Sequence, residues 1–207
     1  MENPLPLQIE EIPLTEKRKK QIIEATYQCI LEKGYNACTM QDIADKTEVS
    51  KGIIHYYFDT KEKLLISAME NLVNQWDALI ADKLNGIKDP KQALRGLLDV
   101  CLEIAQDGVS YEMLVNFWSE ISQKKAFRDV NAHFYSHYRQ MIGDIIEEGI
   151  NQGLFKKVDP HLLATLIISI IDGLSLQWLF DKKAFALGKA KKMAEDLILA
   201  LLRDKSS

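Results

Sequence analysis

The stretch that decides the fold runs from Thr39 to Leu65 and reads TMQDIADKTEVSKGIIHYYFDTKEKLL. It opens with Thr39-Met40-Gln41-Asp42, a capping-box pattern in which a hydroxyl and a carboxylate satisfy free backbone N–H groups at a helix start. Ser50 is a favourable N-cap for a further short helix, and Thr60 is a favourable cap for the helix after it. The pattern therefore predicts short helices that are separated by tight turns.

Helical periodicity extends on both sides of this stretch. Before it, apolar side chains recur at helical spacing over residues 15–33, and Gly34 ends the run. After it, the fourth helix is expected to continue for about 25 residues before Gly86. Further helices are predicted near 90–107, 110–123, 126–152, 160–181 and 188–203, two of them opened by the Asp-Pro pairs at 89–90 and 159–160. No strand-like alternation is present, so the predicted fold class is all-α with about nine helices.

Composition agrees with a globular chain. Hydrophobic residues make up 47% of the 207 residues and charged residues 27%, a balance that can bury a sizeable core. The first residues lack the basic and apolar regions of a secretion signal. The longest apolar run, Leu162 to Ile171, is shorter than the ~20 residues of a membrane-spanning helix. We therefore expect a buried helix there and a cytoplasmic protein.

Three cysteines, Cys29, Cys38 and Cys101, form no CxxC pair, and their odd number argues against a disulfide framework. They are expected to be buried thiols in a reducing compartment.

Net charge is −4, which by itself disfavours nucleic-acid binding because basic side chains neutralise phosphates. Residues 14–64 carry nine basic and eight acidic side chains. A DNA-binding interpretation must therefore rest on the geometry of the motif. The run Lys17-Arg18-Lys19-Lys20 either contacts the DNA backbone or is simply a solvated face.

Three short helices, the last two separated by a tight turn, are the framework of a helix-turn-helix, whose later helix enters the major groove of DNA. In the segment after Ser50, Ile54 and Phe58 are spaced i, i+4 and are expected to face inward. Lys51, Gly52, His55 and Tyr56 would then be free to meet DNA. The lack of a side chain at Gly52 lets the helix approach a phosphate or base closely.

The residues of this stretch resemble the TetR family of regulators. The resemblance is carried by TMQDIA at 39–44, VSKG at 49–52 and YFDTKEKLL at 57–65. Three segments, GIIHYYF at 52–58, Phe117-Trp118 and IDGL at 171–174, look most like the betaine-pathway repressor branch. One departure is Glu48, which stands in the turn where the family usually has glycine. If the turn requires a positive φ at this position, a non-glycine residue there costs about 1 kcal/mol.

Residues 1–13 contain three prolines and no helical period, so they are expected to form a flexible arm. The resemblance implies a helix-turn-helix domain over 14–65 and a ligand-binding and dimerisation domain over 66–207. It implies a homodimer, formed through the last two helices, that binds a pseudo-palindromic DNA operator and is released by a small-molecule effector. The implied DNA-contacting residues are Thr39, Ser50, Lys51, Gly52, His55, Tyr56, Tyr57 and Lys61, with Thr39, Tyr56 and Lys61 as phosphate anchors.

Aromatic and polar side chains in the central helices are candidates for the wall of a ligand cavity, although core packing explains any one of them. The candidates are Tyr111, Phe117, Trp118, Phe134, Tyr138, Asp172, Gln177 and Trp178. Trp118 and Trp178 are the first choices. An acid among aromatic rings suits a cationic ligand held by cation–π contacts.

Other chemistries have little support in the sequence. His133 and His137 are spaced i, i+4, as in some zinc sites, but no further ligand is evident, so they are expected to line a pocket or face solvent. No cofactor or metal is expected. The alternative, an all-α ligand carrier or enzyme without a DNA role, lacks a nucleophile constellation, a Gly-rich phosphate loop or a di-iron motif.

Overall fold

The computed structural model describes residues 14–121 and 124–203, and within these ranges it contains nine helices and no strand. The all-α prediction is confirmed. Backbone contacts divide the chain into two compact units, residues up to Ala68 and residues from Met69 onward. Each unit is described by itself. The predicted arm over residues 1–13 lies outside the described residues.

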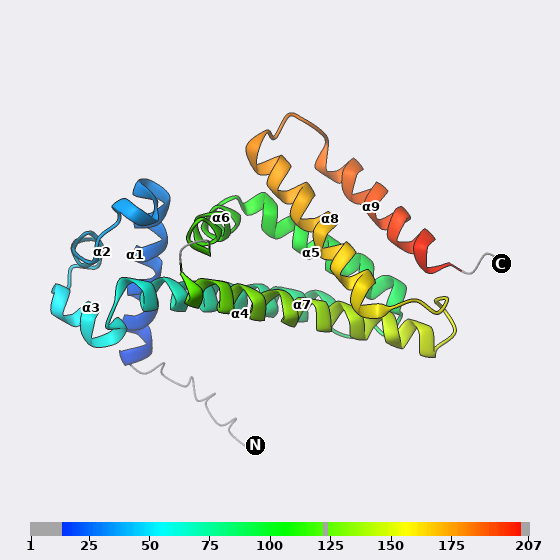
Figure 1. Ribbon diagram of the computed structural model, residues 1–207, viewed down its shortest axis with the longest axis horizontal. Helices are drawn as coiled ribbons and strands as arrows, with labels where there is room; N and C mark the ends of the chain where they lie inside the picture. Colours follow the sequence, from blue (N-terminus) through cyan, green and yellow to red (C-terminus); the bar gives the residue numbers. More distant parts are fainter. Residues whose placement is uncertain (1–13, 122–123, 204–207) are drawn as a thin grey trace, which may run out of the picture. The chain divides into compact units, whose positions relative to one another are not determined.

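The N-terminal unit is built from α1 (Leu14–Ala37), α2 (Met40–Thr47), α3 (Lys51–Phe58) and the first residues of α4 (Lys61–Leu84) (Figure 1). The stripe predicted for α1 is buried, with Ile22, Cys29 and Ile30 almost fully enclosed. Gly34 leaves helical geometry at φ 75, as expected for a helix-ending glycine, but helical hydrogen bonding resumes and carries α1 to Ala37.

Caps define the two short helices. Thr39 and Asp42 form the predicted capping box, with the Asp42 amide donating to the Thr39 hydroxyl oxygen and the Thr39 amide donating to the Asp42 carboxylate. The Ser50 side chain accepts from the amide of Ile53 at the start of α3. Between them Glu48 takes left-handed geometry at φ 54, ψ 35, so the turn keeps the shape that glycine would give it and carries about 1 kcal/mol of strain.

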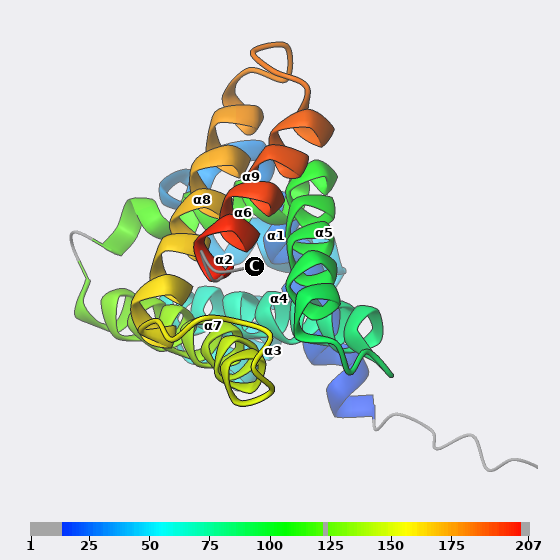
Figure 2. The same cartoon turned by 90° about the vertical axis from the view of Figure 1, so that its right-hand side faces the viewer.

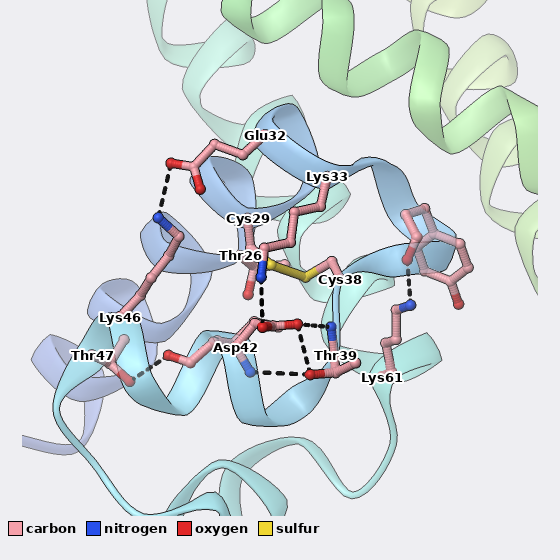
Figure 3. The surroundings of a disulfide bond; sticks show 12 residues. Thr26, Cys29, Glu32, Lys33, Cys38, Thr39, Asp42, Lys46, Thr47 and Lys61 are labelled. Atoms are coloured by element: carbon pink, nitrogen blue, oxygen red, sulfur yellow. Dashed lines mark hydrogen bonds and ion pairs between the residues drawn. A yellow bond between two sulfur atoms is a disulfide. The ribbon is translucent and has the colours of Figure 1, made fainter.

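The prediction of free cysteines is wrong for two of the three. Cys29 and Cys38 are joined by a disulfide, with their Cα atoms 5.8 Å apart, while Cys101 is free. The turn at Gly34 folds the chain back so that residues nine apart in sequence meet, a pairing that a search for CxxC motifs does not detect. Figure 3 shows the disulfide beside the ion pair between Lys33 and Asp42, which are 2.6 Å apart (Nζ to Oδ1). Both contacts hold the start of α2 against α1.

The C-terminal unit contains the rest of α4 and five further helices, α5 (Pro90–Asp107), α6 (Val109–Ile121), α7 (Lys125–Asn151), α8 (Pro160–Phe180) and α9 (Leu187–Leu202). Asp89 and Asp159 cap α5 and α8 through their carboxylates, each followed by proline at the first helical position. The predicted boundaries of these helices agree with the structure to within two or three residues.

The core of the C-terminal unit lies among α5, α7 and α8, with α9 packed along α5 and α8 (Figure 2). Leu97, Ile142, Ile146 and Ile167 are almost fully buried there. Gly149 allows the tightest approach, because a Cβ atom at this position would collide with the ring of Phe155. The chain can therefore turn back after α7 and enter α8 without separating the two helices.

Helix α8 is buried along one face and exposed along another. It continues through Asp172 and Gly173 to Phe180, and it is long and apolar enough, with a mean hydropathy of 1.8, to satisfy the length and composition of a membrane span. One face is buried in the core through Ile167 and Ile171. Leu162 and Leu166 on another face are 58% and 50% exposed, so the expectation of a buried helix holds for one face only.

Candidate functional site: a reading helix and a ligand cavity

The outward face of α3 carries the residues predicted to meet DNA. Ile54 and Phe58 are buried, as the i, i+4 spacing predicted. Lys51, Gly52 and His55 are exposed, and Tyr56 is 83% exposed. A large aromatic side chain without a packing role in its own unit is a feature of interaction surfaces. The ring of Tyr56 contacts the half-buried Tyr57 edge-on.

Local contacts leave this face open. A Cβ atom at Gly52 would meet nothing closer than the Ser50 hydroxyl oxygen at 3.7 Å, so packing does not require the glycine. Its effect is to bare the backbone near the helix start. His55 Nδ1 lies 2.9 Å from the carbonyl oxygen of Asp59, which favours a proton on Nδ1 and leaves Nε2 for an outside partner.

Two predicted phosphate anchors already have partners within the unit. The Thr39 hydroxyl donates to Asp42 Oδ2 at 2.7 Å, although its side chain remains exposed. The Lys61 ammonium donates to the backbone carbonyl of Tyr35 and lies 4.1 Å from the centre of its ring. Lys61 therefore has a structural role that the sequence did not indicate.

The basic run at the start of α1 is partly compensated. Arg18 donates to Gln21, and Lys19 pairs with Glu16 at 3.1 Å. Lys17 and Lys20 are exposed. The run is solvated, and it leaves cationic groups accessible to a polyanion.

The C-terminal unit encloses a largely apolar cavity of about 70 Å³, room for roughly five water molecules at ~10–15 Å³ each. Helices α4, α5, α6, α7 and α8 all contribute to its wall. The lining residues are Trp76, Ile80, Leu97, Cys101, Ile104, Tyr111, Leu114, Phe134, Tyr135, Tyr138, Ile142, Ile168, Ile171 and Asp172. Such a cavity admits a compact molecule rather than a long chain.

Asp172 is the one acid among these lining residues. Its Oδ2 accepts a hydrogen bond from the Tyr135 hydroxyl at 2.7 Å, and the Tyr111 hydroxyl donates to its backbone carbonyl at 3.3 Å. Burial raises the pKa of the Asp172 carboxyl, while hydrogen bonding from the two tyrosines opposes that rise. Burial likewise raises the pKa of the Cys101 thiol to about 12, so this thiol is protonated.

The structure brings together half of the predicted ligand residues. Tyr111, Phe134, Tyr138 and Asp172 line the cavity. The other four do not, and they are Phe117, Trp118, Gln177 and Trp178. Sequence reasoning missed Trp76 and Tyr135, which lie on the wall. Trp76 is spaced i, i+4 from the buried Leu72, and Tyr135 is spaced i, i+3 from the candidate Tyr138, so helical spacing was the available signal.

Each of the four candidates that do not line the cavity makes other contacts. Phe117 stacks on Phe127, with ring centres 4.8 Å apart. The Trp118 indole donates to Asn131 at 2.8 Å. The Gln177 amide donates back to Gly173, and the Trp178 ring lies below Lys182. The two tryptophans that were first choices are therefore packing and surface residues.

His133 and His137 line a separate pocket formed by α4, α6 and α7. His137 Nε2 is 3.1 Å from Asp77 Oδ1, and the Tyr138 hydroxyl donates to the same oxygen at 3.0 Å. No group of three metal-ligating side chains occurs among the described residues. His137 and Tyr138 therefore link α7 to α4 through the Asp77 carboxylate.

Two family descriptions match the chain. Residues 22–68 match "Bacterial regulatory proteins, tetR family", and residues 90–203 match "BetI-type transcriptional repressor, C-terminal". The HTH-type transcriptional regulator BetI of Proteus mirabilis is 29% identical over 198 residues, which cover 92% of this chain and 96% of that protein. BetI of Paraburkholderia phymatum is 24% identical over 199 residues, which cover 95% of this chain and 99% of that protein.

Solved structures agree with this fold. A TetR transcription regulator from Haloarcula marismortui has a TM-score of 0.82 at 28% identity and covers 91% of this chain and 100% of its own. A transcriptional regulator from Saccharomonospora viridis, solved in complex with choline, has a TM-score of 0.81 at 25% identity, with coverage of 92% and 100%. The chain belongs to the TetR family of transcriptional regulators, with a TetR-type helix-turn-helix and a C-terminal domain of the BetI type.

Proposed function

We propose that this regulator is a repressor that binds a pseudo-palindromic DNA operator as a homodimer and is released by a small cationic effector. The exposed face of α3 carries the DNA half of the proposal, because the side chains of Lys51, His55 and Tyr56 are all exposed on it. Ser50, Gly52, Tyr57 and Thr39 complete the proposed contacts. Lys61, which also bonds to the Tyr35 carbonyl, belongs to the same proposed set.

Replacing Tyr56 with alanine is expected to weaken operator binding about tenfold, the effect of losing one or two contacts worth roughly 1 kcal/mol. Electrophoretic shift on DNA from upstream of the gene measures this loss. Tyr56→Phe separates the hydroxyl from the ring. Melting temperature and dimer content should stay at wild-type values in both variants. Unchanged affinity in Tyr56→Ala would show that this face does not meet DNA.

The proposed dimer uses the outer face of α8 and α9. Phe180, Met193 and Leu197 are 73%, 74% and 52% exposed there, and Leu162, Leu166 and Leu201 extend the surface. Exposed apolar area on this scale is typical of a subunit interface. The proposed interface also explains why α8 is as long and apolar as a membrane-spanning helix. We therefore place the protein in the cytoplasm and not in a membrane. We propose no enzymatic activity for it.

The effector half of the proposal rests on the cavity. Tyr111, Phe134 and Tyr138 present rings around Asp172, and rings with one carboxylate attract a cation through cation–π and Coulomb interactions. The relative solved with choline binds a small quaternary ammonium ion. A cation of this class is the effector we propose here.

Asp172→Asn is expected to reduce choline affinity by tenfold to a hundredfold, because a charge-assisted contact of ~1.5–3 kcal/mol is lost. Isothermal titration calorimetry measures this change. In the wild type, affinity should fall as pH is lowered through the raised pKa of Asp172, hence at a higher pH than for an exposed aspartate. The variant should show no such dependence. Asp144→Asn, which removes an exposed acid of α7, is the matched control. Equal affinity in both variants would contradict the assignment.

Helix α4 offers a route from effector to operator. It begins at Lys61, directly after α3, and its residues Trp76 and Ile80 line the cavity. By linkage, an effector that weakens operator binding must itself bind more weakly to the DNA-bound protein. Titrating choline into the protein with and without operator tests this reciprocity.

A further inference from the structure

A second cavity, of about 280 Å³, opens between α7 and α8 next to the central one. Three residues, Tyr135, Ile168 and Asp172, line both cavities. Arg139, Thr165 and Ser169 complete the second wall. Because these three residues line both, the two cavities adjoin each other at Asp172.

Arg139 lacks an anionic partner. Its Nε atom is buried and makes no hydrogen bond in the part of the chain that the structure describes. No carboxylate within residues 14–121 or 124–203 forms an ion pair with it. A guanidinium keeps its charge at physiological pH, and a buried donor without an acceptor is destabilising. An acceptor from outside the described chain would remove this cost.

The other polar groups of the second cavity are engaged. The Thr165 hydroxyl donates to the carbonyl of His161 at 2.9 Å, and the Ser169 hydroxyl donates to the carbonyl of Thr165 at 2.9 Å. Asp172 receives its hydrogen bond from Tyr135. The two adjoining cavities therefore present the Asp172 carboxylate among aromatic rings in one and the Arg139 guanidinium in the other.

We propose, building on the cationic effector argued above, that the effector is a small zwitterion whose anionic group binds Arg139. Its ammonium group lies among the rings beside Asp172, and its carboxylate accepts from the guanidinium. Tyr135 and Arg139 are spaced i, i+4 on α7, which places their Cβ atoms about 5–6 Å apart on one face. Because Tyr135 also bonds to Asp172, the proposal calls for a ligand in which a short chain joins the two charges.

The test compares acids with their esters. Trimethylammonio carboxylates with one, two or three methylene groups between the charges are titrated calorimetrically against their methyl esters, which keep the cation and lose the anion. With the wild type, the best acid is expected to bind at least tenfold more tightly than its ester, since hydrogen bonds between charged groups are worth ~1.5–3 kcal/mol. Choline, which has no anionic group, should resemble the esters.

Variants locate the anion. Arg139→Gln should remove the preference for the acid while leaving ester and choline affinity unchanged, and Arg139→Lys should retain part of the preference. Arg95→Gln, at an exposed arginine of α5 that lines neither cavity, is the matched control. Melting curves confirm folding, and the comparison of acid and ester in the wild type does not depend on any variant.

The outcomes separate the two proposals. Esters and choline that bind as tightly as every acid would overturn the zwitterion and leave the cationic effector standing. Failure of acids, esters and choline alike would overturn both proposals. Loss of the dimer in Arg139→Gln, with the preference for the acid intact, would assign the arginine to a subunit interface and also overturn the anion site.

Discussion

Replacing Leu197 with glutamate is expected to convert the dimer into monomers and to weaken operator binding by a hundredfold or more. Leu197 is 52% exposed on α9, in the apolar surface shared with α8. In the proposed dimer this glutamate would be buried, and burial of an unpaired carboxylate costs several kcal/mol. A monomer binds one half-site alone and loses the gain of ~10²–10⁴ in affinity that comes from linking two binding modules.

The chain offers a matched control for this variant. Leu79 on α4 is also 52% exposed but lies outside the α8 and α9 surface, so Leu79→Glu should leave both dimer content and operator affinity unchanged. Sedimentation velocity reports the mass of each species, and fluorescence anisotropy with labelled operator reports affinity. Dimeric Leu197→Glu would show that the subunits associate through another surface.

Removing the disulfide between Cys29 and Cys38 is expected to destabilise the N-terminal unit by roughly 2–3 kcal/mol. The two cysteines are nine residues apart, and loop-closure entropy predicts roughly this value for so short a loop. The loss should be confined to the unit that contains both cysteines. Hydrogen exchange over residues 14–68, measured with and without reductant, should show faster exchange in α1 and α2 and no change in α8.

Two variants make the test specific. The double variant Cys29→Ala, Cys38→Ala should resemble the reduced wild type and should no longer respond to reductant. Cys101→Ala removes the free thiol of the other unit and should respond to reductant as the wild type does. If the unreduced wild type reacts with alkylating agent at Cys29 and Cys38 after unfolding, the bond is not formed and the expectation fails.

Local signals in the sequence were sufficient for the helices. The capping box at Thr39, the N-cap at Ser50 and the Asp-Pro pairs at 89–90 and 159–160 each act within one helical turn, and each prediction is confirmed. The inward pair Ile54 and Phe58 follows from spacing alone. These features depend on neighbouring residues and not on the tertiary fold.

The residues that line the cavity depend on how the helices pack against one another. Choosing candidates by their aromatic type was therefore a poor guide to this wall. Trp118 and Trp178 were favoured because they are large and aromatic, yet Trp118 bonds to Asn131 and Trp178 lies near Lys182. Tyr135 lines both cavities through its position on α7. The disulfide was missed for the same reason, since it depends on the return of the chain after Gly34.

Glu48 is expected to affect how the protein searches non-operator DNA. Its left-handed backbone holds the turn between α2 and α3 as glycine would, but it adds an exposed negative charge next to the reading helix. A genome offers millions of non-specific sites that compete with the operator, and a regulator must dissociate from them. We expect repulsion between the Glu48 carboxylate and the phosphates to shorten the residence time of the protein on non-operator DNA. The turn would then increase sequence specificity and lower overall DNA affinity.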